Sequence, residues 1–144
     1  MTTVKQLLQT KGHNVWTITP DISVYDALKL MVEKNVGALV VLEGENLVGI
    51  ISERDYARMT ILKEDFSMAT PVSEIMTKKV IGIRPEQTIE ECMALMTDKR
   101  VRHLPVFADD QLVGIVSIGD VVKAIISHQE FIIEQLENYI VGSG

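Results

Sequence analysis

The chain has 144 residues, of which 47% are hydrophobic, and it carries a formal net charge of −6. This length and apolar content suit one folded module with a real core and exclude a disordered tail. The negative charge disfavours nucleic-acid binding, because neutralisation of phosphates by cations supplies most of that affinity.

Membrane insertion, export and disulfide bonding are not expected either. The longest apolar run, around residues 36–42, is far shorter than the roughly 20 residues of a membrane span. No basic segment followed by an apolar one precedes the first apolar strand. The single cysteine, Cys92, excludes an internal disulfide and fits a reducing compartment. We therefore expect a cytoplasmic protein.

An internal repeat dominates the sequence. Residues 15–59 align with residues 80–124 at a constant offset of 65, and fifteen of the 45 aligned positions are identical. Average residue usage would give about three identities by chance. A unit this short rarely buries its apolar face alone, so we expect the halves to pack together and to form related clefts.

The first repeat predicts a strand, a helix, two strands and a helix, after a short lead-in helix at residues 4–9. Residues 15–19 form an apolar run, and Ser23 then opens a segment with apolar side chains at helical spacing. Two apolar runs, 38–42 and 47–51, flank four polar residues and predict a hairpin. The last helix of the repeat begins after Ser52.

The second repeat predicts the same elements. A polar connector ends in a second lead-in at residues 72–77, and Thr88 with Glu91 forms a capping box at the start of the next helix. A hairpin over residues 104–116 and a helix after Ser117 follow. We divide the chain into repeat domains 1–66 and 67–127 and a helical tail, 128–144.

The tail carries an apolar stripe at helical spacing, which requires a surface to pack against. Its members are Phe131, Ile132, Leu136, Tyr139 and Ile140. A second subunit is one candidate for that surface, so we expect a homodimer.

Catalytic motifs are not found in the sequence. It has no phosphate-binding loop, no nucleophile elbow and no zinc-ligand spacing among its three histidines. The acidic pair Asp109-Asp110 falls in a predicted turn, where solvation explains it. What recurs is Ser-x-x-Asp at a strand-to-helix junction, with Asp55 in the first repeat and Asp120 in the second. Such a pair can simply cap the helix.

The motif belongs to a wider pattern. This consists of Val-Ser-Glu-Ile-Met-Thr (72–77), Arg-Pro-Glu-Gln-Thr-Ile-Glu-Glu-Cys-Met (84–93), Arg-His-Leu-Pro-Val (102–106) and Leu-Val-Gly-Ile-Val-Ser-Ile-Gly-Asp (112–120). The pattern resembles cystathionine-β-synthase (CBS) domains, two of which form a Bateman module, and it is similar to stand-alone bacterial and organellar pairs. The resemblance covers about residues 3–127, and the first repeat departs from it where Val40 stands in the place of Pro105. It implies a mixed α/β (α+β) fold of two β-α-β-β-α repeats related by a pseudo-twofold axis.

The resemblance also implies two clefts that bind adenosine-containing ligands such as AMP, ADP, ATP, NAD or S-adenosylmethionine. Each cleft would combine the Ser-x-x-Asp junction of one repeat with the first strands of the other. The first cleft is expected to comprise Ser52, Glu53, Arg54, Asp55, Arg58, Thr77, Val80, Ile81, Arg102, His103, Leu104 and Pro105. The second is expected to comprise Ser117, Ile118, Asp120, Val15, Trp16, Thr17, Gly37, Ala38 and Leu39.

Elementary chemistry agrees with such clefts. A carboxylate can accept hydrogen bonds from both ribose hydroxyls, and an apolar slot suits a purine. Because Arg54 aligns with Gly119 and Arg102 with Gly37, we expect the first cleft to be more cationic and to hold phosphate. The second is expected to be roomier and less positive, with Trp16 either stacking on adenine or packing in the fold.

These expectations describe a non-enzymatic regulatory module. It would sense an adenine nucleotide without a metal and signal through an unidentified protein target or through its own assembly. The alternatives are a structural or scaffolding dimer whose Ser and Asp only cap helices, and an S-adenosylmethionine sensor. A nucleotide-hydrolysing enzyme has little support, and neither nucleic acid nor a membrane is an expected partner.

Overall fold

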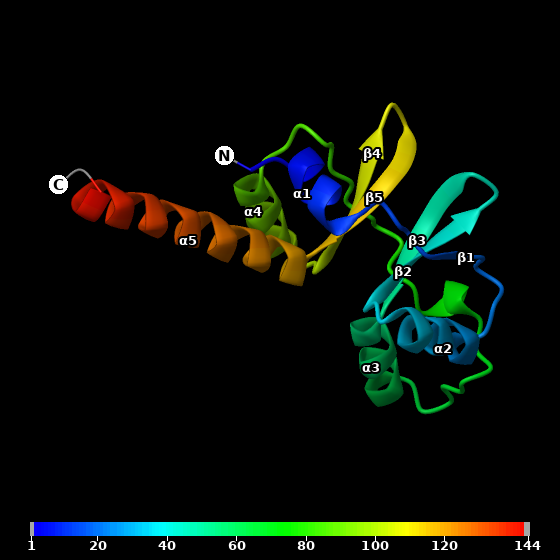
Figure 1. Ribbon diagram of the computed structural model, residues 1–144. Helices are drawn as coiled ribbons and strands as arrows, with labels where there is room; N and C mark the ends of the chain where they lie inside the picture. The colour runs from blue at the N-terminus through cyan, green and yellow to red at the C-terminus, as the bar shows by residue number, and fades with distance from the viewer. Residues whose placement is uncertain (1, 143–144) are drawn as a thin grey trace. The chain divides into compact units, whose positions relative to one another are not determined.

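The computed structural model describes residues 2–142, which divide into two units (Figure 1). One unit is the continuous stretch Val15–Ile81, and the other joins the chain up to Asn14 with the chain from Gly82 onward. Each unit combines helices with a small β-sheet, which confirms the expected mixed α/β class.

The continuous unit contains three strands, two α-helices and a short 3-10 helix. In chain order they are β1 (Thr17–Ile18), α2 (Val24–Lys34), β2 (Ala38–Glu43), β3 (Asn46–Ser52), α3 (Glu53–Leu62) and η1 (Val72–Glu74). β1 lies parallel to β2, and β3 lies antiparallel to β2, which confirms the first predicted hairpin.

Capping residues set the two ends of α2. The apolar face of α2 packs in the core of this unit. The Ser23 side chain accepts a hydrogen bond from the Asp26 backbone N–H at the start of the helix, and Asn35 in the left-handed conformation ends it. The core residues are Ile18, Val24, Ala27, Met31, Leu39, Val41, Ile51, Val72 and Ile75.

The second unit contains three α-helices and a two-stranded sheet. They are α1 (Val4–Lys11), α4 (Ile89–Lys99), β4 (His103–Ala108), β5 (Gln111–Ser117) and α5 (Ile118–Gly142). β4 and β5 form the second predicted hairpin, and its turn is at Asp109 and Asp110, both with positive φ. The hairpin and the turn are therefore confirmed.

The strand expected at the start of the second repeat is reduced to a single bridge, in which Ile83 pairs with Val106. In the first repeat, the Val40 N–H donates to the Trp16 carbonyl and extends the β1–β2 pairing. Pro105 occupies the position equivalent to Val40 and has no N–H to donate. The parallel pairing in the second repeat is shorter for this reason.

The lead-in segments pack against the opposite repeats. The lead-in before the first repeat, α1, binds the second repeat through backbone bonds from the Val4 N–H to the Gln87 carbonyl and from the Lys5 N–H to the Pro85 carbonyl. The lead-in before the second repeat, η1, binds the first through a bond from the Val72 N–H to the Ile22 carbonyl. The expected boundaries at residues 66 and 127 divide the chain into consecutive repeats. The two units differ from these expected domains because each lead-in packs with the opposite repeat.

The last helix runs without a break through the expected tail boundary. α5 begins at Ile118 and extends over 25 residues, and Figure 1 shows its C-terminal half, in orange and red, reaching beyond the other elements of its unit. The apolar side chains Phe131, Leu136 and Ile140 are exposed along it. None of the helices formed by residues 2–142 is both long enough and apolar enough to cross a membrane.

Candidate functional site

The Asp55 carboxylate lies at the amino end of α3 and is held by neutral donors. Its Oδ2 atom accepts hydrogen bonds from the Ser52 backbone N–H at 2.9 Å and from the Ser52 hydroxyl at 3.1 Å. Its Oδ1 atom accepts a bond from the Thr77 hydroxyl at 3.1 Å. Thr77 is fixed in turn by two backbone bonds with Ile50 along the edge of β3. Three of the residues expected in the first cleft are therefore brought together within one unit.

The Asp120 carboxylate, at the amino end of α5, is held by a cation. Its Oδ2 atom accepts bonds from the Ser117 backbone N–H at 2.8 Å and from the Lys11 ammonium at 2.5 Å. The ammonium also donates to the Ile115 carbonyl, so it ties the end of α1 to β5 and to α5. Burial acts to raise the pKa of Asp120, but the bonds from Lys11 and Ser117 outweigh burial and bring the pKa below its ordinary value.

Lys11 is absent from the residues expected at this site. It has no sequence pattern that relates it to Asp120, and the two meet only because the lead-in helix packs on the second repeat. The equivalent donor in the first repeat is the neutral hydroxyl of Thr77. The two junctions share Ser and Asp but differ by one positive charge at the carboxylate.

The other residues expected in the first cleft divide between the units. Glu53, Arg54 and Arg58 are exposed on α3, and Val80 and Ile81 are half-buried in the same unit. Arg102 is exposed, His103 is half-buried, and Leu104 and Pro105 are buried in β4 of the other unit. That these residues share a cleft stays a prediction.

The residues expected in the second cleft also divide between the units. Ile118 is exposed at the start of α5, whereas Val15, Trp16, Thr17, Gly37, Ala38 and Leu39 belong to Val15–Ile81. Ala38 and Leu39 are buried in β2. The Lys34 ammonium lies 4.4 Å from the centre of the Trp16 ring, in a cation–π contact that covers one ring face.

The two helix starts are built in the same way. The Glu53 N–H donates to the Gly37 carbonyl at 3.1 Å, and at the equivalent position the Ile118 N–H donates to the Arg102 carbonyl at 2.8 Å. Arg102 therefore lies beside the start of α5 in its own unit. Its expected role at the Asp55 site stays a prediction.

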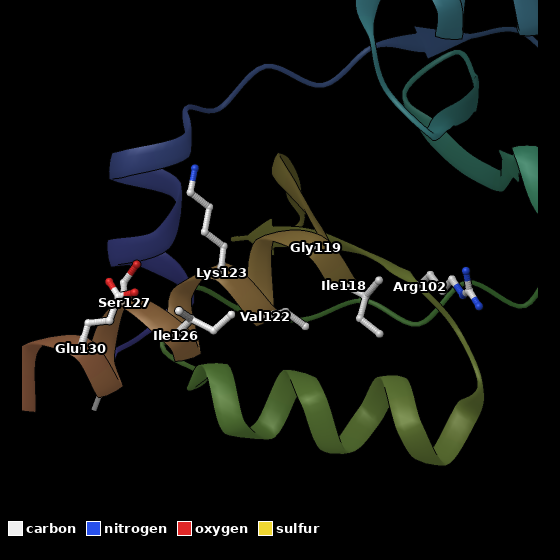
Figure 2. A pocket seen from close by; sticks show the side chains of 8 residues that line it. All are labelled: Arg102, Ile118, Gly119, Val122, Lys123, Ile126, Ser127 and Glu130. Carbon is white, nitrogen blue, oxygen red and sulfur yellow. The ribbon is translucent and has the colours of Figure 1, made fainter. Parts of the chain in front are cut away.

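An open groove of about 730 Å³ follows the exposed face of α5 (Figure 2). It is lined by Arg102, Ile118, Gly119, Val122, Lys123, Ile126, Ser127 and Glu130. Figure 2 shows Arg102 at one end of the row and Ser127 with Glu130 at the other, with apolar side chains between them. The groove is thus largely apolar along its length, with Arg102 and Glu130 toward opposite ends and Lys123 between them.

Two features of the described residues bear on metal binding and on thiol chemistry. Across residues 2–142, no three His, Cys, Asp or Glu side chains lie close enough together to hold a metal ion. Cys92 is buried on α4, and this burial, with the charges of Glu91 and Glu90, raises the pKa of its thiol to about 11. A thiol of that pKa is a poor nucleophile near neutral pH.

Comparison with known proteins places both repeats in one family. The family model described as the CBS domain matches residues 4–60 and 72–127. The mitochondrial CBS domain-containing protein CBSX3 of Arabidopsis thaliana is 43% identical over an alignment 151 residues long, which covers 98% of this chain and 73% of that protein.

Solved structures show the same relationship. A proposed signal-transduction protein with CBS domains from Burkholderia ambifaria is 51% identical, has a TM-score of 0.84, and matches 89% of this chain and 96% of its own. The CBS domain pair of protein MJ0100, solved with 5′-methylthioadenosine and S-adenosyl-L-methionine, is 25% identical with a TM-score of 0.78. That match covers 89% of this chain and 98% of the MJ0100 chain.

Proposed function

Because the chain belongs to the CBS domain family and carries two copies of the domain, we propose that it is a regulatory module that binds an adenosine-containing ligand. The observation that carries the proposal is the pair of Ser-x-x-Asp junctions, each with a half-buried carboxylate at the amino end of a helix. Asp55 and Asp120 would each accept hydrogen bonds from the ribose hydroxyls of one ligand.

The ligand class is supported by the chemistry of the junctions and by one neighbour. A carboxylate at a helix start is held by its capping bonds, so its position is set before a diol binds. The MJ0100 pair binds two adenosine derivatives. We propose AMP, ADP, ATP or NAD as the ligand of this chain, with S-adenosylmethionine as the alternative.

A scaffold without a ligand is the rival function. Ser52 and Asp55 form a complete capping box, in which each side chain bonds the backbone N–H of the other. Helix capping therefore accounts for these residues without any ligand. The two functions make different predictions for removal of the carboxylate.

Calorimetric titration with AMP, ATP, NAD and S-adenosylmethionine tests the proposal. We expect at least one to bind, and Asp55→Ala or Asp120→Ala to weaken binding about 10- to 100-fold, which corresponds to the loss of one charge-assisted hydrogen bond. Asp98→Ala, which removes an exposed carboxylate from α4, is the matched control and should bind as the wild type does. If no adenylate binds at millimolar concentration, or if both variants bind unchanged, the scaffold function is favoured.

We also propose that the module is a homodimer formed through α5. An apolar stripe at the spacing of a coiled-coil seam runs along the exposed face of this helix, with Gln129 at one interior position. Its apolar members are Val122, Ile126, Ile133, Leu136 and Ile140, all of them exposed. Lys123 lies beside one end of the stripe and Glu137 beside the other. In an antiparallel pair, each Lys123 would approach the Glu137 of the second copy, which favours that orientation.

Sedimentation velocity tests the dimer. Ile133→Glu places a charge in the middle of the stripe and should convert the protein to a monomer. Gln135→Glu adds the same charge to the same helical turn, away from the stripe, and should remain dimeric. A wild type that sediments as a monomer at about 100 μM would contradict the proposed dimer.

The output of the module would be a shift between conformational or assembly states. A ligand can change the population of two states only by binding them with different affinity. A protein target that recognises one state, or a change in the association of α5 with its copy, would convert ligand binding into a signal.

A further inference from the structure

We propose that Lys11 makes the Asp120 site selective for phosphorylated nucleosides, an inference that rests on the proposed function. Lys11 is the last residue of α1, and its ammonium contacts the carboxylate proposed to hold the ribose. The side chains of Lys11 and Asp120 remain 29% and 25% exposed, so a ligand can reach both.

The ammonium and a ribose compete for the same carboxylate. Asp120 Oδ2 already accepts one bond from the Ser117 N–H, so Lys11 takes the second lone pair of that oxygen. A ribose that places one hydroxyl on each oxygen of this carboxylate must therefore displace the ammonium from Oδ2. Displacement separates a charge pair and leaves the ammonium with the Ile115 carbonyl and water as partners.

The cost of that displacement depends on what else the ligand carries. Adenosine has no anionic group, so it gives the displaced ammonium no new partner. A nucleoside monophosphate carries its phosphate a few bonds from the ribose, and the flexible lysine side chain can turn to it. One charge-assisted bond then replaces another, and the exchange favours the phosphorylated ligand.

The Asp55 site has no equivalent exchange. There the third donor is the Thr77 hydroxyl, which is neutral and is fixed beside β3 by the backbone bonds of Thr77 with Ile50. Any preference of that site for phosphate would have to come from other cations, such as the exposed Arg54 and Arg58 of α3. Substitution of Lys11 should therefore change the preference for phosphorylated nucleosides more strongly at the Asp120 site than at the Asp55 site.

Titrations in an Asp55→Asn background isolate the Asp120 site. The quantity measured is the preference, defined as the Kd for adenosine divided by the Kd for AMP, from calorimetry. Adding Lys11→Met should lower this preference about tenfold, partly by tightening adenosine binding. Lys11→Arg keeps the cation and should retain most of the preference. Lys5→Met removes the same charge from the same helix, at an exposed position, and should leave the preference unchanged.

The remaining outcomes distinguish a failure of the proposed role of Lys11 from a failure of the proposed function. An unchanged preference in the Lys11→Met variant, with thermal unfolding showing that the variant is folded, would overturn the role of Lys11 but not the proposed function. Loss of all AMP binding in the Asp55→Asn background would also overturn it, because the Asp120 site would then bind no nucleotide. If wild-type protein binds neither adenosine nor AMP nor any other adenylate, the proposed function fails and this inference fails with it.

Discussion

Gly49 and Gly114 occupy the same position in the two repeats, but a methyl group would meet different neighbours at each. A Cβ on Gly49 would lie 2.6 Å from the Met76 sulfur and 2.9 Å from the Thr77 backbone oxygen. A Cβ on Gly114 would lie 2.7 Å and 2.9 Å from the two terminal carbons of Leu8. Substitution by alanine therefore forces a shift in both repeats, but of different groups.

The loss of folding stability caused by the alanine substitution should be larger at Gly49 than at Gly114. The end of the Leu8 side chain can move by rotation, whereas the Thr77 carbonyl is held by its bond from the Ile50 N–H. Overfilling a packed site costs about 1–3 kcal/mol, and we assign the lower end to Gly114→Ala and the upper end to Gly49→Ala. At about 4 °C per kcal/mol for a chain of this size, Tm should fall by about 4 °C and about 12 °C respectively.

Differential scanning calorimetry of the two variants measures this difference. The smaller backbone entropy of alanine in the unfolded chain affects both variants alike and cancels in the comparison. Gly49→Ala should also weaken AMP binding at the Asp55 site, because a shift of Thr77 moves the Thr77 hydroxyl away from the Asp55 carboxylate. Equal losses of Tm, or a larger loss for Gly114→Ala, would refute the reasoning from the fixed carbonyl.

Three further outcomes are expected. Because the native pKa of Asp120 lies below its ordinary value, its ionised form stabilises the fold above about pH 4, and this contribution is lost as pH falls through the native pKa. Thermal scans should therefore show Asp120→Asn less stable than wild type at about pH 6, with the difference closing in acid. Cys92, with a pKa of about 11, should react with iodoacetamide at least about 100-fold more slowly in the native protein than in urea, as followed by mass spectrometry. Arg100→Gly should raise Tm by several degrees and Asn35→Gly by less, because both residues have positive φ and asparagine tolerates it better.

Much of the fold could be predicted because its signals are local. The hairpins follow from apolar runs separated by polar turn residues, and Ser23 and Thr88 cap the helices that follow them. Because the two repeats predict the same elements, each local pattern is found twice in the sequence. The shortened strand at Ile83 also has a local cause in Pro105, although its effect is visible only once the strand pairing is known.

The site was less predictable because part of it depends on packing between distant segments. The Ser-x-x-Asp junctions could be found in the sequence because both residues lie within one helical turn. Lys11 could not, because no periodicity or motif relates the end of α1 to the start of α5. The difference in charge between the two carboxylate sites is therefore a tertiary property of the fold.

The crossed packing of the lead-in segments has a consequence for how this chain can be cut. A fragment that begins at residue 67 would keep η1, which belongs to the other unit, and would lack α1, whose Val4, Leu7 and Leu8 are buried within its own. Such a fragment would present a bare apolar surface to water. Neither repeat thus contains every segment that packs in its unit. Expression of one repeat without the lead-in that precedes the other repeat should give an insoluble product.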